Sequence, residues 1–548
     1  MAGTVKTSRR AFMKTVGLAG AAALAATVAG CAPTGNEKGL AASGAALEGA
    51  DDSWDEEFDV IVVGAGAAGT AAAVEVSRLD ENASCLLLEK EKMPSGCTPY
   101  SGGIMVWGTD STEILTYLKA LTKGHTPDDV LTAFAEGLVD LRPWLHSFDL
   151  ADDAFGMDIP PEVFPGAEHP ELPGNQSLGL IRVGNGFGSG TGSNGSYGHV
   201  HELLLDIIAN TSSVEYRTGC PAEDLVQSPN DGTILGVVAD GKRIKATKGV
   251  IMACGGFEHN EKMKAAFLGT PYAASYSGMG NTGDGIAMVQ KVGAALWHMN
   301  ACAGFWMGGR DLENTAFTTT NFDADTRPKQ FGITVGVNGR RFYMDYDSVM
   351  GNCGNGEQNG YERNSDHTIH VGSRHGYMQF GGEWTHLPMP EKAWFVFDAD
   401  GLAAGAIEQT LSTDPVADGY VVAADSIDEL AQLIEVPSDE LSQTIETWNG
   451  FCSEGIDRAF YRPERTLNPV KNGPFYAQLC IPAMLNTDGG PCRNAKAEVL
   501  DAEGNAIPHL YAAGEFGSVW SGTYQGGGNI AECMVFGRIA AKSALESA

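Results

Sequence analysis

The glycine-rich segment Gly64-Ala65-Gly66-Ala67-Ala68-Gly69 has the residue types and spacing best suited to chemistry in this chain. In the pattern G-x-G-x-x-G, the first glycine permits a tight turn and the second lets the backbone approach a pyrophosphate. The third lets a helix pack closely on a strand. A helix that begins here points its amide groups and its positive dipole end at the phosphates. The segment therefore predicts a dinucleotide site that uses Gly64, Gly66, Ala67, Ala68 and Gly69.

The residues on either side of this segment predict one βαβ unit. Phe58–Val63 is a short apolar run, typical of a buried parallel strand, and Cys85–Leu88 is a second such run. The Ala-rich stretch from Thr70 to Arg78 between them predicts a helix. Glu89 follows Gly69 by twenty residues, where a carboxylate accepts hydrogen bonds from a ribose. Glu89 and its neighbour Lys90 are therefore predicted cofactor-binding residues.

The N-terminus predicts an export signal. Ser8-Arg9-Arg10-Ala11-Phe12-Met13-Lys14 has the twin-arginine pattern, and an Ala-rich apolar stretch of about sixteen residues follows, short for a membrane span. It ends in Val28-Ala29-Gly30-Cys31, which resembles the lipobox of bacterial lipoproteins, so Cys31 is predicted to carry a lipid. The alternative is plain cleavage, with Cys31 incidental. Residues 1–31 are thus a predicted signal peptide and residues 32–56 a predicted flexible linker.

Composition limits the classes of partner and cofactor. The 548 residues are enough for two or more domains. The net charge of −33 repels nucleic acid, and it indicates either a solubilising surface or a docking face for a basic redox partner. Eleven cysteines include no C-x-x-C pair, which argues against an iron–sulfur cluster, and most are expected to be buried thiols. His367, His370 and His375 are expected in a solvent-facing loop, so no metal site is predicted.

The later chain predicts a fold assembled from both ends. Short β-type runs between Val214 and Val238 predict a small meander, and Gly249–Gly256 predicts a strand that ends in glycines. Leu510–Gly514 predicts a last strand, and Asn529–Ser547 a long Ala-rich helix. We therefore expect an α/β fold in which a discontinuous Rossmann-like cofactor domain receives an inserted α+β substrate-capping domain. The predicted limits are 57–264 and 476–548 for the first domain and 265–475 for the second.

Several blocks in order resemble the FAD-dependent fumarate reductase and 3-ketosteroid dehydrogenase superfamily, over essentially all of residues 57–548. The matching blocks are Val60-Ile-Val-Val-Gly-Ala-Gly-Ala-Ala-Gly69, Ser101-Gly-Gly103, Met252-Ala-Cys-Gly-Gly-Phe257, Asn281-Thr-Gly-Asp-Gly285, Asn338-Gly-Arg-Arg-Phe342, Leu510-Tyr-Ala-Ala-Gly-Glu515, Gly527-Gly-Asn529 and Phe536-Gly-Arg-Ile-Ala540. The resemblance implies that the dinucleotide is FAD. Some relatives attach flavin covalently through a histidine near the position of Cys97. This chain lacks that histidine, so we expect it to bind FAD non-covalently.

The resemblance also implies further cofactor residues. They are Ser101, Gly102, Gly103, Val226, Ala253, Gly255, Asp284, Gly514, Glu515, Gly528, Asn529 and Ile530. Glu515 is expected on the ribityl chain, and the Gly526–Ile530 loop beside the flavin pyrimidine. A helix N-terminus at that loop would stabilise the negative charge of reduced flavin.

The positions that select substrate depart from the fumarate reductase pattern. Those enzymes carry a histidine where this chain has Asn486, and an arginine proton donor where it has Val349. Their substrate arginine before the late glycines corresponds to Tyr524 or Gln525. A dicarboxylate needs several cations to offset its charge. Since these cations are missing, the pattern argues against fumarate as the substrate.

The late block is instead similar to that of the ketosteroid dehydrogenases. In that branch a tyrosine hydroxyl and a glycine amide four residues later polarise the substrate ketone, and Tyr524 and Gly528 have this spacing. Two such donors would stabilise the enolate formed during hydride transfer; the alternative is that Tyr524 packs under the flavin. That branch has a tyrosine at the position of Val349. Tyr346 is our candidate for the proton-transfer residue, with nearby Tyr343 and a packed aromatic as alternatives.

These patterns predict an exported FAD-dependent oxidoreductase on the outer face of the cytoplasmic membrane. The expected reaction is reduction of a C=C bond conjugated to a carbonyl, in a small enone, enoate or steroid-like substrate. Electrons are expected from a membrane cytochrome, an FMN protein or a quinone, because NAD(P)H is scarce outside the cytoplasm. One alternative is a ketosteroid dehydrogenase-type desaturase. Another is a ligand-binding lipoprotein that contains flavin.

Overall fold

The structure is a computed structural model. It describes residues 53–94, 96–163, 166–167, 169, 172–184, 199–275, 277–310, 317–318, 331–342, 345, 361–363, 369–371, 391–406, 414–417, 419, 421–462, 464–521 and 523–547. The predicted signal peptide, Tyr343, Tyr346 and Val349 lie outside these residues, as does the side chain of His370. Within the described part of the chain, no helix combines the length and the apolar character that crossing a membrane requires.

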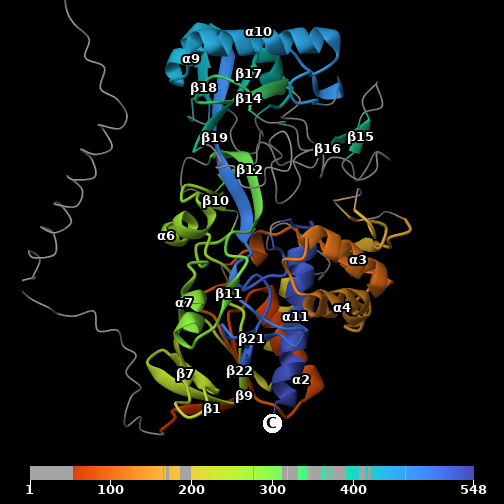
Figure 1. Ribbon diagram of the computed structural model, residues 1–548, viewed down its shortest axis with the longest axis vertical. Helices are drawn as coiled ribbons and strands as arrows, with labels where there is room; N and C mark the ends of the chain where they lie inside the picture. The colour runs from red at the N-terminus through yellow and green to blue at the C-terminus, as the bar shows by residue number, and fades with distance from the viewer. Residues whose placement is uncertain are drawn as a thin grey trace, which may run out of the picture. The chain divides into compact units, whose positions relative to one another are not determined.

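An eight-stranded sheet forms the base of the cofactor half (Figure 1). Its central strand β1 (Glu56–Val63) runs parallel to both neighbours, β9 (Lys242–Met252) and β2 (Cys85–Leu88). Residues 60–63 and all of β2 are buried, as expected for a parallel sheet covered on both faces. The order is β21-β22-β9-β1-β2-β6, with β7 and β8 added beside β9. The bounds are β6 Val214–Arg217, β7 Ala222–Gln227, β8 Ile234–Ala239, β21 Glu498–Leu500 and β22 Ala506–Ala512.

Helices α2 (Ala67–Leu79) and α11 (Gly528–Glu546) pack against each other beside this sheet, although they come from opposite ends of the chain (Figure 1). Both helices bury small residues where they meet: alanine fills most of the buried positions of α2, and α11 contributes Gly537, Ala540, Ala541 and Ala544. The axes approach so closely that a Cβ on Gly537 of α11 would lie 2.6 Å from the carbonyl oxygen of Ala68. This contact joins the N-terminal glycine motif to the late part of the chain.

Three antiparallel strands and three helices pack beside α2 and α11. They are β3 (Met105–Gly108), β4 (Phe155–Ile159) and β5 (Leu178–Val183), with α3 (Ser111–Thr122), α4 (Asp128–His146) and α5 (Val200–Ala209). Their apolar side chains belong to the same core as α2 and α11. Short elements nearby are the 3₁₀ turns Thr98–Tyr100 and Asp152–Ala154, helices α6 (Glu261–Met263) and α7 (Asp284–Lys291), the π turn Lys264–Leu268, and the strands β11 (Leu296–Trp297) and β20 (Gly490–Pro491).

A second sheet is organised around the long strand β19 (Phe475–Thr487). Its order is β13-β12-β19-β17-β14, with β10 and β18 also paired to β19. The bounds are β10 Ala274–Ser275, β12 Cys302–Arg310, β13 Phe317–Thr318, β14 Gly332–Gly336, β17 Ala393–Asp398 and β18 Val422–Ala424. Helices α9 (Ile427–Leu433) and α10 (Ser438–Glu454) bury their apolar side chains against this sheet. The remaining elements are α8 (Ala399–Ala403), β15 (Tyr361–Arg363), β16 (Ile369–Val371) and a 3₁₀ turn at Glu464–Thr466.

The predicted α/β fold class is confirmed, and β2 has the predicted bounds. Strand β1 begins at Glu56, inside the predicted linker, because its register with β9 extends to Glu56 and the Asp55 amide donates to Arg243 O. The predicted meander is wrong at its start: β6 pairs in parallel with β2, and only β7, β8 and β9 form the antiparallel run. The limits of the two domains stay a prediction.

Two helical glycines test the close packing of α11 on α2. Gly537→Ala would push a methyl group into Ala68 O and is expected to destabilise the protein by about 1–3 kcal/mol. Gly450→Ala in α10 meets no atom within 4 Å and is expected to stabilise it by about 0.5–1 kcal/mol. Chemical denaturation measures both values. Equal effects of the two substitutions would contradict the close approach of α2 and α11.

Candidate functional site

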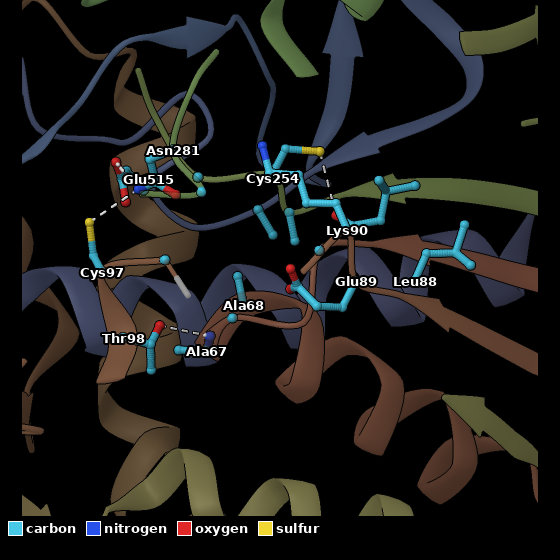
Figure 2. A pocket seen from close by; sticks show the side chains of 18 of the residues that line it. Ala67, Ala68, Leu88, Glu89, Lys90, Cys97, Thr98, Cys254, Asn281 and Glu515 are labelled. Carbon is cyan, nitrogen blue, oxygen red and sulfur yellow. Dashed lines mark hydrogen bonds between the residues drawn. The ribbon is translucent and has the colours of Figure 1, made fainter. Parts of the chain in front are cut away.

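A cavity lies at the carboxyl ends of the parallel strands, where the chain leaves β1, β2, β9 and β22 (Figure 2). The predicted cofactor residues that line it are Gly64, Gly66, Ala67, Ala68, Glu89, Lys90, Ala253, Gly255, Asp284 and Glu515. It is also lined by residues that were not predicted to bind the cofactor, namely Val63, Leu88, Gly96, Cys97, Thr98, Cys220, Ala222, Cys254, Gly280, Asn281, Met288, Ala513 and Cys533. The carboxyl edge of a parallel sheet is where open α/β folds bind ligands.

The three glycines of the motif have the three predicted environments. Gly64 has φ +102°, and a Cβ there would lie 2.3 Å from Ala253 O. A Cβ on Gly69 would lie 1.8 Å from Gly64 O, so the start of α2 rests on the end of β1. Gly66 differs, because its Cβ would meet only Thr98 Oγ1, at 3.4 Å. The backbone at Gly66 is therefore open on the side of the cavity that Thr98 and Ala67 line, which suits a pyrophosphate.

The N-terminus of α2 carries the electrostatics of an anion site. Its N-cap is Gly66, which offers no side chain to the first amides of the helix, and only the Ala67 amide is bound by a side chain, donating to Thr98 Oγ1 at 3.0 Å. The His201 ring nitrogen Nε2 lies 2.7 Å from Ala65 O, and burial lowers the pKa of His201. A neutral His201 thus donates to the loop and holds it in place.

Glu89 closes the other end of the cavity. Its Oε2 accepts the Ala65 amide at 3.1 Å and its Oε1 the Glu91 amide at 3.0 Å, while burial raises the pKa of its carboxyl. Lys90 Nζ lies 2.9 Å from Asp284 Oδ2 and 3.1 Å from Thr282 Oγ1. Lys90 and Asp284 thus form an ion pair at the rim of the cavity, beside Glu89. A carboxyl so placed retains acceptor capacity for ribose hydroxyls.

At the opposite end, Cys97, Asn281 and Glu515 point toward one another (Figure 2). Asn281 Nδ2 lies 3.3 Å from Cys97 Sγ and 3.5 Å from Glu515 Oε1. Burial and the nearby carboxyls raise the pKa of the Cys97 thiol well above its ordinary value. A neutral thiol is a poor nucleophile, which supports the predicted non-covalent attachment of FAD.

Ser101 lies just outside the cavity lining and is held by a histidine pair. Burial lowers the pKa of His199 to about 4, so its ring is neutral. His199 Nδ1 accepts the His201 amide at 3.1 Å, which leaves Nε2 to donate to Ser101 Oγ at 2.9 Å. The Gly103 amide in turn donates to Ser101 Oγ at 3.3 Å. The Ser101–Gly103 turn is therefore tied to α5, the helix that also supplies His201.

The late loop places Tyr524 at the start of α11. Tyr524 is 4% exposed, its ring meets Trp520 edge to face at 5.6 Å, and its hydroxyl accepts the Asn529 amide at 3.4 Å. The Gly528 amide donates to Gln525 O at 2.8 Å, as part of the turn into the helix. Tyr524 and Gly528 are thus adjacent, but the predicted second carbonyl donor is engaged within the loop.

Other predicted residues are placed away from the cavity lining. Val226 lies on β7, four residues beyond the lining residue Ala222, and pairs with Gly236. Gly514 lies against α2: a Cβ added at this position would be 2.7 Å from Ala68 Cβ. Asn529 donates through Nδ2 to Asn486 Oδ1, and Ile530 is buried in the core of α11. Tyr346 and Val349 lie outside the described residues, as do the His367 and His375 positions.

The described residues fit FAD. The open backbone at Gly66 and the uncapped start of α2 would hold the pyrophosphate, and Glu89 the adenosine ribose. Glu515 and Asn281 would hold the ribityl chain of FAD at the other end of the same cavity. Helix α11 begins at Gly528, so a helix N-terminus lies at the predicted loop, and its dipole role toward flavin stays a prediction. Asn281 begins one of the family blocks and Cys97 lies near the flavin-attachment position of some relatives, so the sequence pointed to both segments without giving either residue a role.

Comparisons with known proteins agree with this geometry. The model of the family described as FAD binding domain matches residues 59–530. The chain is 29% identical to digoxin reductase of Eggerthella lenta, over 98% of this chain and 96% of that protein. It is 27% identical to 3-oxosteroid 1-dehydrogenase of Mycolicibacterium smegmatis, over 89% of this chain and 97% of that protein. It is 28% identical to urocanate reductase of Eggerthella lenta, over 91% and 76%.

Solved structures show the same fold. The 3-ketosteroid Δ1-dehydrogenase of Sterolibacterium denitrificans superposes with a TM-score of 0.70 at 21% identity, covering 90% of this chain and all of that one. A flavocytochrome c3 fumarate reductase gives a TM-score of 0.65 at 22% identity, covering 90% and 78%. The chain therefore belongs to the FAD binding domain family, and it is an FAD-dependent oxidoreductase of the fumarate reductase and ketosteroid dehydrogenase group that acts on C=C bonds.

Proposed function

We propose that this protein is exported and reduces a C=C bond conjugated to an uncharged carbonyl group. The observation that carries the proposal is the Tyr524 hydroxyl, buried at the first turn of α11 and bonded to the Asn529 amide. FAD, when bound, supplies the hydride from N5. The protein supplies the pocket, the orientation and the hydrogen bond to the carbonyl oxygen.

The loop that carries this hydroxyl is uncharged. Ser518–Ile530 contains no Asp, Glu, Lys, Arg or His. Asn486 occupies the expected histidine position and accepts from Asn529 Nδ2, while its own Nδ2 lies 3.3 Å from Asp488 Oδ1. A dicarboxylate placed here would lose its hydration without gaining a cation in this loop. A ketone, lactone or ester carbonyl needs only a neutral donor.

Tyr524 acts through its hydroxyl on the carbonyl oxygen, where negative charge develops as hydride reaches the β-carbon. The Asn529 amide donates to the same hydroxyl oxygen and so polarises it toward donation. The first amides of α11 add the positive end of a helix dipole. The proton for the α-carbon is assigned to Tyr346 by sequence alone.

The relatives support both the substrate class and its limits. Digoxin reductase and 3-oxosteroid 1-dehydrogenase are named for steroid-type molecules, and urocanate reductase for a small acid. The neutral loop at Tyr524 favours the first kind, a bulky and uncharged enone or unsaturated lactone. An enoate remains within the proposed class, with its carboxylate away from Tyr524.

Location favours reduction as the physiological direction. The twin arginines and Cys31 indicate a lipid-anchored protein outside the cytoplasm, where electrons come from the membrane. A membrane cytochrome, an FMN protein or a quinone is the proposed donor. The second candidate is desaturation of a saturated ketone, which the similarity to 3-oxosteroid 1-dehydrogenases favours.

The direction can be measured on the purified flavoprotein without oxygen. Reduced protein mixed with an enone should regain the absorbance of oxidised flavin within the time of one turnover, because the enone accepts the hydride. Oxidised protein mixed with the matching saturated ketone should keep its absorbance. Bleaching by the saturated ketone, with no reoxidation by the enone, would establish the desaturase and contradict the reductase.

Tyr524→Phe removes the hydroxyl that is proposed to polarise the carbonyl. We expect kcat for the enone to fall by about 10²-fold or more, with FAD content unchanged. Tyr511→Phe is the matched control, since Tyr511 is 3% exposed and its hydroxyl donates to Ser543 O at 3.3 Å, near the C-terminal end of α11 and away from Tyr524 at its start. Normal turnover by Tyr524→Phe would remove Tyr524 from the mechanism.

Arg9→Lys with Arg10→Lys tests the proposed export. The folded, FAD-loaded protein should then accumulate in the cytoplasm, since the export route reads the arginine pair. Cys31→Ala should still leave the cytoplasm but lose its membrane attachment. Cell fractionation with flavin fluorescence measures both. Membrane attachment of the Cys31→Ala protein equal to that of the unaltered protein would argue against a lipid anchor.

A further inference from the structure

Three acidic side chains meet in the interior between the end of β19 and the cofactor cavity. Glu258 is 1% exposed and Asp488 is fully buried, while Glu515 lines the cavity. Glu258 follows the Gly255-Gly256 turn after β9, and Asp488 directly follows β19. Of the three, the sequence indicated only Glu515, which the family resemblance placed on the ribityl chain.

Glu258 and Glu515 face each other. One carboxylate oxygen from each and the Cys97 sulfur all lie within 4.8 Å of one another. A Cβ on Gly256 would lie 2.3 Å from Glu515 Oε1 and 2.7 Å from Glu258 Oε1, so only a glycine fits between the two. Thr487 holds Glu258 from the other side, through its amide and through its hydroxyl at 2.9 Å.

The cluster lacks a paired cation. Among the described residues, no ion pair includes Glu258, Asp488 or Glu515, and the one lysine that faces Glu258, Lys264, donates to Ala273 O at 2.7 Å. The other titratable groups that face the cluster are Cys97, His259, Cys302, Glu532 and Cys533. None of these supplies a permanent positive charge, so mutual repulsion disfavours a negative charge on every carboxyl at once.

Hydrogen-bonding groups in the cluster agree with bound protons. Glu258 Oε2 and Asp488 Oδ2 are buried and have no hydrogen-bond partner in the described structure. Burial and the neighbouring Glu258 carboxyl raise the pKa of Glu515 well above its ordinary value, and burial with Glu532 does the same for Asp488. Two carboxylates this close repel each other, which favours a proton shared between them.

We propose that Glu258 and Glu515 share one proton and bind a second when FAD is reduced, which makes the pair a proton store for the reaction. The inference rests on the FAD chemistry of the proposed function and is independent of substrate identity. Two-electron reduction with one proton leaves a negative charge on the bound cofactor. That charge, at the wall that Glu515 lines, favours uptake of one proton from solvent by the pair.

Electrons and protons balance over one turnover. The proposed external donor, a cytochrome, an FMN protein or a quinol, would supply two electrons to FAD, and solvent would supply one proton to FAD and one to the carboxyl pair. Reduction of the C=C bond then consumes a hydride from the cofactor and one proton, and the pair returns to its singly protonated form. The total charge of the site stays the same in both states, which spares the low-dielectric interior an uncompensated charge.

The midpoint potential of the bound flavin, measured against pH from 6 to 8, tests the proposal. Two protons per two electrons give a slope of about 59 mV per pH unit, twice the roughly 30 mV that a tenfold change in equilibrium constant represents for a two-electron couple. In Glu258→Gln the amide donates directly to Glu515, so the shared proton is replaced. We expect the slope to fall to about 30 mV per pH unit, the one-proton value.

Controls separate this result from other effects. Glu261→Gln, an exposed acid three residues along, removes the same charge and should leave the two-proton slope unchanged. Glu515→Gln serves as the second test variant if Glu258→Gln does not fold. A redox-difference infrared spectrum should show a protonated-carboxyl band that is lost in either variant.

A one-proton slope in the unaltered protein would overturn the proposal, as would a two-proton slope in Glu258→Gln. Neither outcome depends on turnover. If the enone fails to reoxidise the protein while the slopes behave as expected, the proposed function fails and the proton store stands.

Discussion

The structure depends on the close approach of three backbone segments at the first turn of α2. Gly64 presses on Ala253, Gly69 on Gly64 O, and Gly537 of α11 on Ala68 O. A side chain at Gly64 would separate β1 from the end of β9, one at Gly69 would separate α2 from β1, and one at Gly537 would separate α11 from α2. Because the first two segments come from the start of the domain and α11 from its end, this packing is what assembles a cofactor site from distant parts of the chain.

From that packing, the rest of the site follows. The turn at Gly66 leaves the start of α2 open toward the cavity, and α11 begins where Tyr524 and Asn529 meet. Strand β19 brings Asn486, Thr487 and Asp488 from the second sheet to the same place. These residues connect the carbonyl side, at Asn529, with the ribityl side, at Glu258. The two halves of the reaction thus share one continuous polar network in an otherwise apolar interior.

Local patterns predicted much of this arrangement, because a glycine loop, a buried strand and an Ala-rich helix are each encoded over a few residues. The βαβ unit and the start of α11 are examples. Strand β6 was misplaced in a meander because pairing with β2 is a long-range choice that alternation does not reveal. The contact of Cys97, Asn281 and Glu258 with Glu515 was not predicted for the same reason, since each lies far in sequence from Glu515. Only the structure reveals that the Gly528 amide is engaged with Gln525 O.

The proposed substrate class depends on one electrostatic feature: the loop at Tyr524 offers neutral donors and no cation, which favours an uncharged carbonyl. The most direct measurement compares two acceptors on the same reduced protein without oxygen, a neutral cyclic enone and fumarate, by the return of oxidised-flavin absorbance. We expect reoxidation by the enone and none by fumarate at the same concentration. Faster reoxidation by fumarate would contradict it.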